Sequence, residues 1–377
     1  MRMRILIAGG GTGGHFYPAL AVMEELSRRK SKVKLAYIGT RRGIEARILP
    51  SYPQIHFYSI HAHGLQRGRP LQNLYALLVL VVALLESLAI LLDFRPQVII
   101  GMGGYASFPA VLLGSLLKKV FPMRTVIHEQ NAVAGLTNRL LSPFVDKVLV
   151  SYPQTTRIFT WARQTVVTGN PIRKEFLLAK RSEALYHKFD LNSQRRTVLV
   201  FGGSYGSTAL TTAVLRAKAL IAQNRGIQVL LVTGNTGEEQ AIRNELLQAG
   251  VENVVVRRYI DRMGEAFALA DLIVSRAGAT TLAEITSCGK PALLIPWGGA
   301  ANGHQWKNAR VLEEEEACTL AKEKEILEQG LAKLIEQMLD NQERLTRLAK
   351  NSLRLGQQRA TASILSEITT LAREART

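Results

Sequence analysis

The chain has 377 residues, of which 47% are hydrophobic and 21% charged, enough for two globular domains that each bury a core. Its formal net charge of +18 indicates an anionic partner, such as a phosphorylated substrate or a membrane surface, or else a surplus of charge that only aids solubility. No nucleic-acid-binding motif stands out, so we expect no nucleic-acid partner. The two cysteines form no Cys-x-x-Cys pair, which argues against a structural zinc or a disulfide framework and suits a reducing cytoplasm.

Short and almost continuously apolar strands alternate with helical stretches along the chain. We predict strands in the first half at 4–8, 34–38, 98–100, 125–128 and 147–150, and in the second half at 197–201, 228–232, 254–257, 272–275 and 292–295. This alternation is typical of parallel sheets covered by helices on both faces, so the expected class is α/β. We expect no signal peptide, because Met-Arg-Met-Arg leads straight into the first strand.

The apolar stretch at 74–92 approaches the length of a membrane span and has only Glu86 and Ser87 as polar breaks. Because it lies between two predicted strands, we interpret it as a helix that is buried, or half-buried at a membrane surface, rather than as a span. The preceding segment at 61–69 mixes basic and apolar residues, and it could rest on anionic lipid or form a solvated loop.

Three glycine-rich turns follow predicted strands: one at 101–107, and one near the start of each half of the chain. Gly-Gly-Gly-Thr-Gly-Gly-His occupies 9–15, and Gly-Gly-Ser-Tyr-Gly-Ser occupies 202–207. Such a turn before a helix aims backbone N–H groups and the positive helix end at phosphate, although it can also bind nothing. The first turn fits G-x-G-x-x-G, but the second strand ends in Thr-Arg-Arg without the carboxylate that would hold a ribose; those arginines could hold an NADP phosphate.

Polar side chains collect where predicted strands end. His15 stands where the first turn becomes a helix, and it could take a proton from an attacking hydroxyl or only cap the helix. His-Glu-Gln-Asn at 128–131 follows a strand, where open α/β sheets bind ligands, so we predict that it contacts a sugar; a hydrogen-bonded loop is the alternative. Adjacent His and Glu side chains diverge and have no partner at ligand spacing, so we expect no metal.

Together the motifs resemble those of a known family. In chain order they are G-G-G-T-G-G-H-x-x-P, G-G-Y-x-S-x-P, H-E-Q-N-x-x-x-G, G-N-P-x-R, G-G-S, S-R-A-G-A-x-T-x-x-E and H-Q-x-x-N-A, from residue 4 to about 310. This set resembles the MurG family of bacterial cell-wall N-acetylglucosaminyltransferases. The resemblance implies the GT-B glycosyltransferase fold, two Rossmann-like domains with a deep cleft between them. We expect an acceptor and membrane domain at 1–168, a UDP-GlcNAc-binding domain at 169–354, and a last helix at about 355–377 that can pack back on the first domain.

The resemblance also implies a reaction. GlcNAc would move from UDP-GlcNAc to the C4 hydroxyl of the muramoyl sugar of lipid I, the undecaprenyl-diphosphate-linked acceptor, with inversion and without a cofactor, to give lipid II. The enzyme would lie peripherally on the cytoplasmic face of the bacterial inner membrane, against anionic lipid. His15 is the implied general base, with Glu129 as the second candidate. The implied substrate-binding residues are Thr12, Gly13, Gly14 and Asn131 for the transferred sugar and acceptor, and Arg173, Ser204, Ile260, Ala279, Thr280, Thr281, Leu282, Ala283, Glu284, His304 and Gln305 for the donor.

One position departs from the family pattern. Tyr205 stands where the family usually has glutamine, in G-G-S-Q-G-A, so only backbone amides are expected to act there. Other classes stay open at this point: a related GT-B transferase with another lipid acceptor, an NADP-dependent oxidoreductase, and a nucleotide-sugar epimerase or inactive binding module. The H-E-Q-N and G-G-Y-x-S-x-P blocks favour the MurG family among the transferases.

Overall fold

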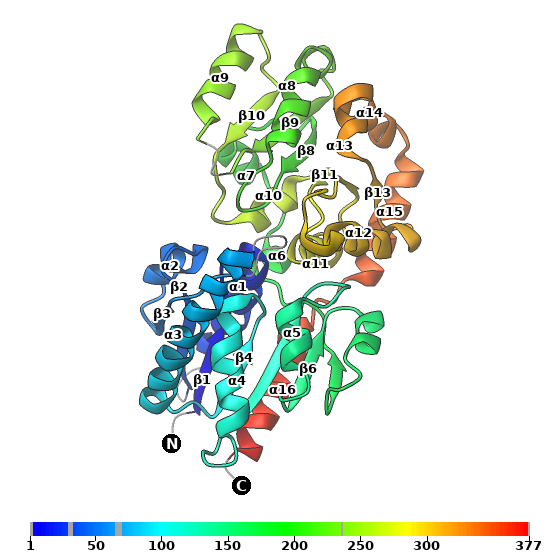
Figure 1. Cartoon of the computed structure of the whole chain (residues 1–377). Coiled ribbons are helices and arrows are strands. Elements are labelled where there is room, and N and C mark those ends of the chain that lie inside the picture. The colour runs from blue at the N-terminus through cyan, green and yellow to red at the C-terminus, as the bar shows by residue number, and fades with distance from the viewer. Residues whose placement is uncertain (1–2, 29–32, 65–69, 235–236, 376–377) are drawn as a thin grey trace. The chain divides into compact units, whose positions relative to one another are not determined.

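The computed structural model describes residues 3–28, 33–64, 70–234 and 237–375, and it divides into two compact units (Figure 1). The first comprises Met1–Arg173 and Arg359–Thr377, and the second comprises Lys174–Gln358. Each unit contains one parallel sheet with helices packed on it, which confirms the predicted α/β class with two Rossmann-like domains. Of the ambiguous segment at 61–69, residues 65–69 lie outside the described residues.

The sheet of the first unit has the strand order β3-β2-β1-β4-β5-β6-β7, and every neighbouring pair is parallel. The chain winds outward from β1 in one direction and from β4 in the other. In such sheets, ligands bind beyond the carboxyl ends of the two strands where the winding reverses. The strands are β1 (Met3–Ala8), β2 (Val33–Thr40), β3 (Ile55–Ile60), β4 (Val98–Gly101), β5 (Arg124–Glu129), β6 (Lys147–Val150) and β7 (Thr165–Val167).

Helices cover both faces of this sheet, which explains its almost continuously apolar strands. Successive strand side chains point to opposite faces. Ile5 and Ile7 therefore join the core under α1 and α16, whereas Leu6 and Ala8 join the core under α3 and α4. The helices are α1 (Gly13–Arg28), α2 (Ile44–Ile48), α3 (Pro70–Phe94), α4 (Phe108–Leu117), α5 (Leu136–Leu141) and α16 (Ala360–Glu374).

Helix α3 contains the apolar stretch at 74–92, and it is long and apolar enough to cross a membrane by length and composition alone. One side of it is packed: Ala83, Ile90 and Leu91 belong to the core of the first unit. The other side is open, since Leu78 and Leu85 are both 64% exposed. Within this unit, α3 is therefore a half-buried helix with an apolar outer face.

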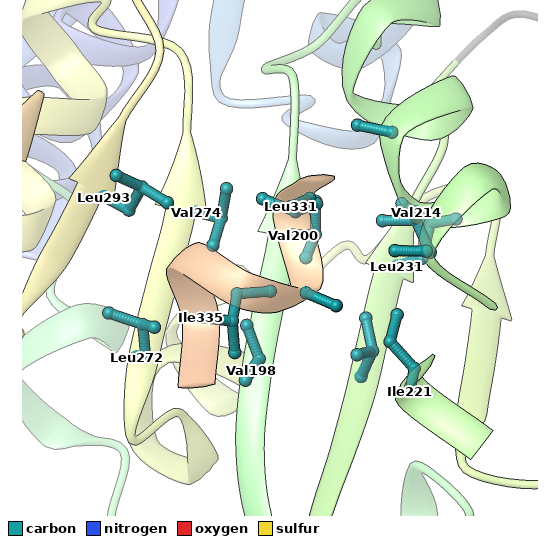
Figure 2. Packing of buried hydrophobic residues seen from close by; sticks show 14 of the residues in the cluster. Val198, Val200, Val214, Ile221, Leu231, Leu272, Val274, Leu293, Leu331 and Ile335 are labelled. Atoms are coloured by element: carbon teal, nitrogen blue, oxygen red, sulfur yellow. The ribbon is translucent and has the colours of Figure 1, made fainter. Parts of the chain in front are cut away.

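The sheet of the second unit has the order β10-β9-β8-β11-β12-β13, again with parallel pairs throughout. Figure 2 shows Leu331 and Ile335 of α14 packed over the strands that carry Val198, Val200 and Val274. The strands are β8 (Arg196–Phe201), β9 (Ile227–Val232), β10 (Val254–Arg257), β11 (Leu272–Ser275), β12 (Ala292–Leu294) and β13 (Thr319–Leu320). The helices are α6 (Glu175–Leu178), α7 (Glu183–Lys188), α8 (Thr208–Gln223), α9 (Glu239–Gln248), α10 (Met263–Leu269), α11 (Ala279–Ser287), α12 (His304–Glu314), α13 (Glu323–Glu325), α14 (Leu331–Asp340) and α15 (Gln342–Leu355).

Candidate active site

The turn between β1 and α1 is held by a buried carboxylate. Glu45, in α2, is fully buried, and its Oε1 accepts hydrogen bonds from Thr40 N at 2.8 Å, Thr40 Oγ1 at 3.0 Å and Gly11 N at 3.4 Å. A Cβ at Gly10 would lie 2.5 Å from this same oxygen, so only glycine fits there. Glu45 was not among the predicted residues, because β2 itself ends without an acidic residue. Since Glu45 faces inward, its carboxylate is not available to a ribose hydroxyl.

The first turn of α1 begins directly after these glycines. The Thr12 carbonyl accepts hydrogen bonds from the N–H groups of His15 at 3.3 Å and Phe16 at 3.2 Å. Thr12 and Gly14 are exposed, and Gly13 is buried. The positive end of α1 therefore lies beyond the carboxyl end of β1, next to β4, where it suits an anionic group.

The His15 side chain lies against a second glycine turn, which follows β4. Gly103 and Gly104 have φ of +88° and +75°, and a Cβ on them would lie 3.1 Å from His15 Cε1 and 3.2 Å from His15 Cδ2. Any residue with a Cβ is therefore disfavoured at both positions, because of the positive φ and because the Cβ would crowd the His15 ring. His15 Nδ1 lies 3.2 Å from Gln130 Oε1, so the half-buried imidazole is held between the glycines and Gln130.

The His-Glu-Gln-Asn block at the end of β5 mostly faces inward. His128, Glu129 and Gln130 are 0%, 2% and 1% exposed, and Asn131 is half-buried. Burial lowers the pKa of His128 to about 4, against smaller raising effects from the Gly169 carbonyl and the Glu129 charge. This block was predicted to contact a sugar, and Asn131, its least buried residue, is the best placed to do so.

The Glu129 carboxylate is engaged on both oxygens. Oε1 accepts from the backbone N–H and the side-chain amide of Asn131, each at 3.0 Å. Oε2 accepts from Gly135 N and from Asn138 Nδ2, each at 2.9 Å. This geometry suits a residue that fixes the loop before α5 better than it suits a proton acceptor for a substrate.

Arg173 is the last residue of the first of the two segments that form the first unit. Its guanidinium lies over the ring of Tyr17, with 4.9 Å between the guanidinium carbon and the ring centroid. A cation stacked in this way is held in place but keeps its charge. Its contact with donor phosphates stays a prediction.

In the second unit, the turn between β8 and α8 packs against the segment that follows β9. A Cβ at Gly206, where φ is +79°, would lie 2.0 Å from the Thr233 carbonyl oxygen. Ser204 is half-buried in this turn, and Tyr205 is 59% exposed. The backbone turn is thus formed with tyrosine at position 205.

Helix α11 begins beyond the carboxyl end of β11, at the centre of the second sheet. The Gly278 carbonyl accepts the N–H of Leu282 at 3.0 Å, so the helix starts at Ala279. Glu284 lies in the second turn of α11 and is only 7% exposed. Of the remaining predicted positions in this helix, Ala279, Thr280 and Leu282 are buried, and Thr281 and Ala283 are half-buried.

The side chain of Gln305 joins two loops of the second unit. Its Oε1 accepts from Trp297 N at 2.9 Å and from Ala277 N at 3.2 Å. Because the oxygen serves these two donors, the amide orientation is fixed and Nε2 is the group that can donate to a ligand. The neighbouring His304 has Nδ1 2.7 Å from the Ala301 carbonyl, so Nδ1 carries a proton.

All predicted site residues lie at or after the carboxyl ends of strands within their own unit, and Ile260 follows β10 in the same way. Parallel strands bring these segments to one edge of each sheet. Across the part of the chain that the structure describes, no group of three or more His, Cys, Asp or Glu side chains is placed to hold a metal ion.

Comparison with known proteins identifies the family. Residues 5–150 match the glycosyltransferase family 28 N-terminal domain, and residues 197–367 match the glycosyltransferase family 28 C-terminal domain. The UDP-N-acetylglucosamine–N-acetylmuramyl-(pentapeptide) pyrophosphoryl-undecaprenol N-acetylglucosamine transferase of Desulforamulus reducens is 40% identical over 96% of this chain and 97% of its own length. The chain belongs to this transferase family.

Solved structures agree with the assignment to this transferase family. The crystal structure of Acinetobacter baumannii MurG matches 98% of the chain and 99% of its own length, with a TM-score of 0.70 and 26% identity. UDP-GlcNAc 2-epimerase from Neisseria meningitidis, with a TM-score of 0.67 over 98% of the chain and 100% of its own length, is only 13% identical and shares the fold alone. The family resemblance inferred from the motifs is confirmed.

Proposed function

We propose that this chain transfers GlcNAc from UDP-GlcNAc to the C4 hydroxyl of the muramoyl sugar of lipid I and so produces lipid II, with inversion at the transferred carbon. The observation that carries the proposal is the 40% identity to the Desulforamulus reducens N-acetylglucosamine transferase, which extends over both units of the chain. The positions of the predicted residues within each unit support it.

On the donor side, the second unit offers groups matched to a nucleotide diphosphate sugar. The start of α11 and the turn containing Ser204 supply a positive helix end and backbone N–H groups for the diphosphate. Glu284 is proposed to accept hydrogen bonds from the ribose hydroxyls, and the backbone at Ile260 to contact uracil. Gln305, with His304 beside it, would donate from Nε2 to a hydroxyl of the sugar.

On the acceptor side, Thr12, Gly13, Gly14 and Asn131 are proposed to contact the transferred sugar and the acceptor diphosphate. His15 is the proposed general base. In the reaction, the C4 hydroxyl oxygen forms a bond to C1 of GlcNAc while the bond from C1 to the UDP oxygen breaks. The hydroxyl proton passes to the imidazole, and UDP leaves with the added negative charge, which helix ends, backbone N–H groups and Arg173 would stabilise.

We also propose that the protein works peripherally on the cytoplasmic face of the inner membrane. The support is the outer face of α3, whose apolar side chains are between 45% and 64% exposed. Such a face, on a chain of net charge +18, suits the surface of an anionic bilayer that presents lipid I. The residues of this apolar row are Leu74, Tyr75, Leu77, Leu78, Val81, Val82 and Leu85.

The decisive experiment is transfer of radiolabelled GlcNAc from UDP-GlcNAc to a lipid I analogue. We expect labelled lipid II, and we expect His15→Ala to bind UDP-GlcNAc normally while turnover falls by about two orders of magnitude or more. Binding of UDP-GlcNAc without transfer by the unaltered protein would contradict the proposed activity. Unchanged turnover in His15→Ala would remove His15 from the role of base. For the membrane, Leu78→Glu combined with Leu85→Glu should reduce sedimentation with anionic phospholipid vesicles, and unchanged sedimentation would contradict the surface assignment.

A further inference from the structure

Two buried side chains of the first unit connect the candidate base to the backbone. His128 Nε2 lies 2.8 Å from the Gly169 carbonyl oxygen, and Gln130 Nε2 lies 3.1 Å from His128 Nδ1. At the other end of the Gln130 amide, Oε1 lies 3.2 Å from His15 Nδ1. These contacts form one continuous chain of hydrogen bonds that ends on the imidazole of His15.

Backbone carbonyls fix the direction of every hydrogen bond in this chain. A carbonyl oxygen only accepts, so His128 Nε2 carries a proton and donates it to Gly169. Gln130 Nε2 also lies 2.9 Å from the Met102 carbonyl oxygen and 3.2 Å from that of His128. An amide turned the other way would place its oxygen against both of these oxygens. Gln130 therefore donates from Nε2, and Oε1 is an acceptor facing His15.

The protonation of His128 agrees with this direction. Burial lowers the pKa of His128 to about 4, so the ring is neutral near pH 7. With its proton on Nε2, a neutral ring has a lone pair on Nδ1, which accepts from Gln130. Each donor in this series of hydrogen bonds thus carries a proton, and each acceptor has a lone pair to receive it.

We propose that Gln130 and His128 are positioning residues that hold His15 with its proton on Nδ1, so that Nε2 carries the lone pair that accepts the proton of the acceptor hydroxyl. This inference rests on the proposed role of His15 as the base. A neutral imidazole carries one ring proton, and the hydrogen bond made by one nitrogen decides which nitrogen is basic. When the hydroxyl proton arrives at Nε2, the Nδ1–H bond to Gln130 is kept, so no other group has to move.

The glycine turn after β4 contributes the orientation of the ring. Gly103 and Gly104 lie against opposite parts of the imidazole, at distances where a Cβ would touch it. Rotation of the ring about its bond to Cβ would exchange Nδ1 for a carbon at Gln130 and break the hydrogen bond. The packed glycines therefore hold the plane of the ring, and the amide selects which of its two flipped orientations is occupied.

The test reads the tautomer directly, by nitrogen NMR of protein labelled with ¹⁵N-histidine. The His15 signals are assigned by their loss in His15→Ala. We expect Nδ1 at the shift of a protonated nitrogen and Nε2 at that of an unprotonated one. Gln130→Met keeps the side-chain length without the hydrogen bonds; it should change this pattern and lower kcat by about tenfold or more, while KM for UDP-GlcNAc changes by less than about twofold.

Gln130→Glu is the matched control, because a carboxyl group protonated on the oxygen that faces the Met102 carbonyl still donates there and offers its other oxygen to His15 Nδ1. We expect it to keep the Nδ1–H pattern and more of kcat than Gln130→Met. A proton on Nε2 in the unaltered protein would overturn the inference, as would an unchanged pattern in Gln130→Met. The first measurement needs no Gln130 variant, so it applies even if Gln130→Met does not fold. It also needs no turnover, so its failure is distinct from failure of the proposed base, which His15→Ala reports.

Discussion

The substitution Glu129→Gln separates a positioning role for this residue from the role of base. Glutamine has the same shape, but one acceptor oxygen becomes an NH₂ group. Two of the four donors around the carboxylate, either the pair from Asn131 or the pair from Gly135 and Asn138, would then face another donor. We therefore expect the main effect to be on stability.

The four hydrogen bonds give the size of this effect. A hydrogen bond to a charged group contributes about 1.5–3 kcal/mol, so the loss of two, with partial relaxation of the loop, should lower the free energy of unfolding by about 3 kcal/mol. In a unit of this size, 1 kcal/mol corresponds to about 2–4 °C, so Tm should fall by about 6–12 °C. Turnover measured well below the transition should fall by less than about tenfold.

Scanning calorimetry and the transfer assay together decide the outcome. Glu314→Gln, which removes an exposed carboxylate from α12, is the control and should leave both Tm and turnover unchanged. If Glu129→Gln left Tm within about 1 °C of the unaltered protein but reduced turnover by about a hundredfold or more, Glu129 would be the base and the positioning role would be wrong.

Three further predictions follow from other contacts. Burial lowers the pKa of His128 from 6.5 to about 4, so the neutral ring contributes fully to stability above about pH 6.5, and this contribution is lost as the pH falls toward 4. About 2 kcal/mol of the unfolding free energy should be lost by pH 5. His128→Gln should flatten the measured dependence of unfolding free energy on pH between these values. Glu284→Ala should weaken UDP-GlcNAc binding by about tenfold in titration calorimetry, since a charged acceptor for ribose is removed, and equal affinity would refute the ribose assignment. Gly206→Ala, with a Cβ 2.0 Å from the Thr233 carbonyl oxygen and φ of +79°, should destabilise the second unit by about 1–3 kcal/mol and weaken donor binding, as measured by urea unfolding and the same titration.

The central strands could be predicted from the sequence because helices cover both faces of each sheet. A strand buried on both faces reads as a continuous apolar run, and every predicted strand is present. The strands that were missed are β3, β7 and β13, and all three lie at sheet edges. β7 and β13 are only three and two residues long, and β3 mixes apolar residues with His and Ser. In these three edge strands the apolar run is short or interrupted, so the pattern gives no signal. β10 also lies at an edge, but its run of three valines is continuous, and it was predicted.

Packing partners that are distant in sequence could not be predicted from the residue pattern. A last helix was expected at about 355–377, and it was the family resemblance that implied that this helix can pack back on the first domain. In the structure, Ile364, Leu365 and Ile368 of α16 join the core of the first unit, and Glu367 forms an ion pair with Lys147 at 2.7 Å. An amphipathic helix reveals which of its faces is buried, but not which surface covers that face.

Candidate site residues could be predicted where motifs lie at strand ends. They could not be predicted where buried polar side chains form hydrogen bonds with distant parts of the chain. Glu45 carries no local signal, because its partners are the backbone of Gly11 and the end of β2. Arg276 is a similar case: it lies within a motif, but its guanidinium donates to the Ile295 carbonyl and pairs with Glu323. Both contacts depend on the finished fold. The sequence patterns therefore predicted candidate site residues, but not the buried side chains that hold the surrounding segments in place.

The His-Glu-Gln-Asn block makes two separate sets of contacts, one toward His15 and one toward the loop before α5. In an extended segment, alternate side chains point to opposite sides. His128 and Gln130 accordingly contact each other and lead toward His15, whereas Glu129 and Asn131 contact each other and hold the loop before α5. Asn138 Nδ2 donates both to Glu129 Oε2 and to the His128 carbonyl, but the hydrogen bonds that join the side chains of His128, Gln130 and His15 do not include it. Substitutions in the two pairs should therefore have separable effects.

This separation gives a last prediction. Glu129→Gln should lower Tm without changing the nitrogen NMR pattern of His15, because the contacts of Gln130 with Met102, His128 and His15 are left in place. Gln130→Met should change the pattern of His15 whatever its effect on Tm. If Glu129→Gln shifted the proton on His15 as strongly as Gln130→Met does, the two pairs would be coupled through the backbone of β5, and Gln130 would not act on His15 through its amide alone.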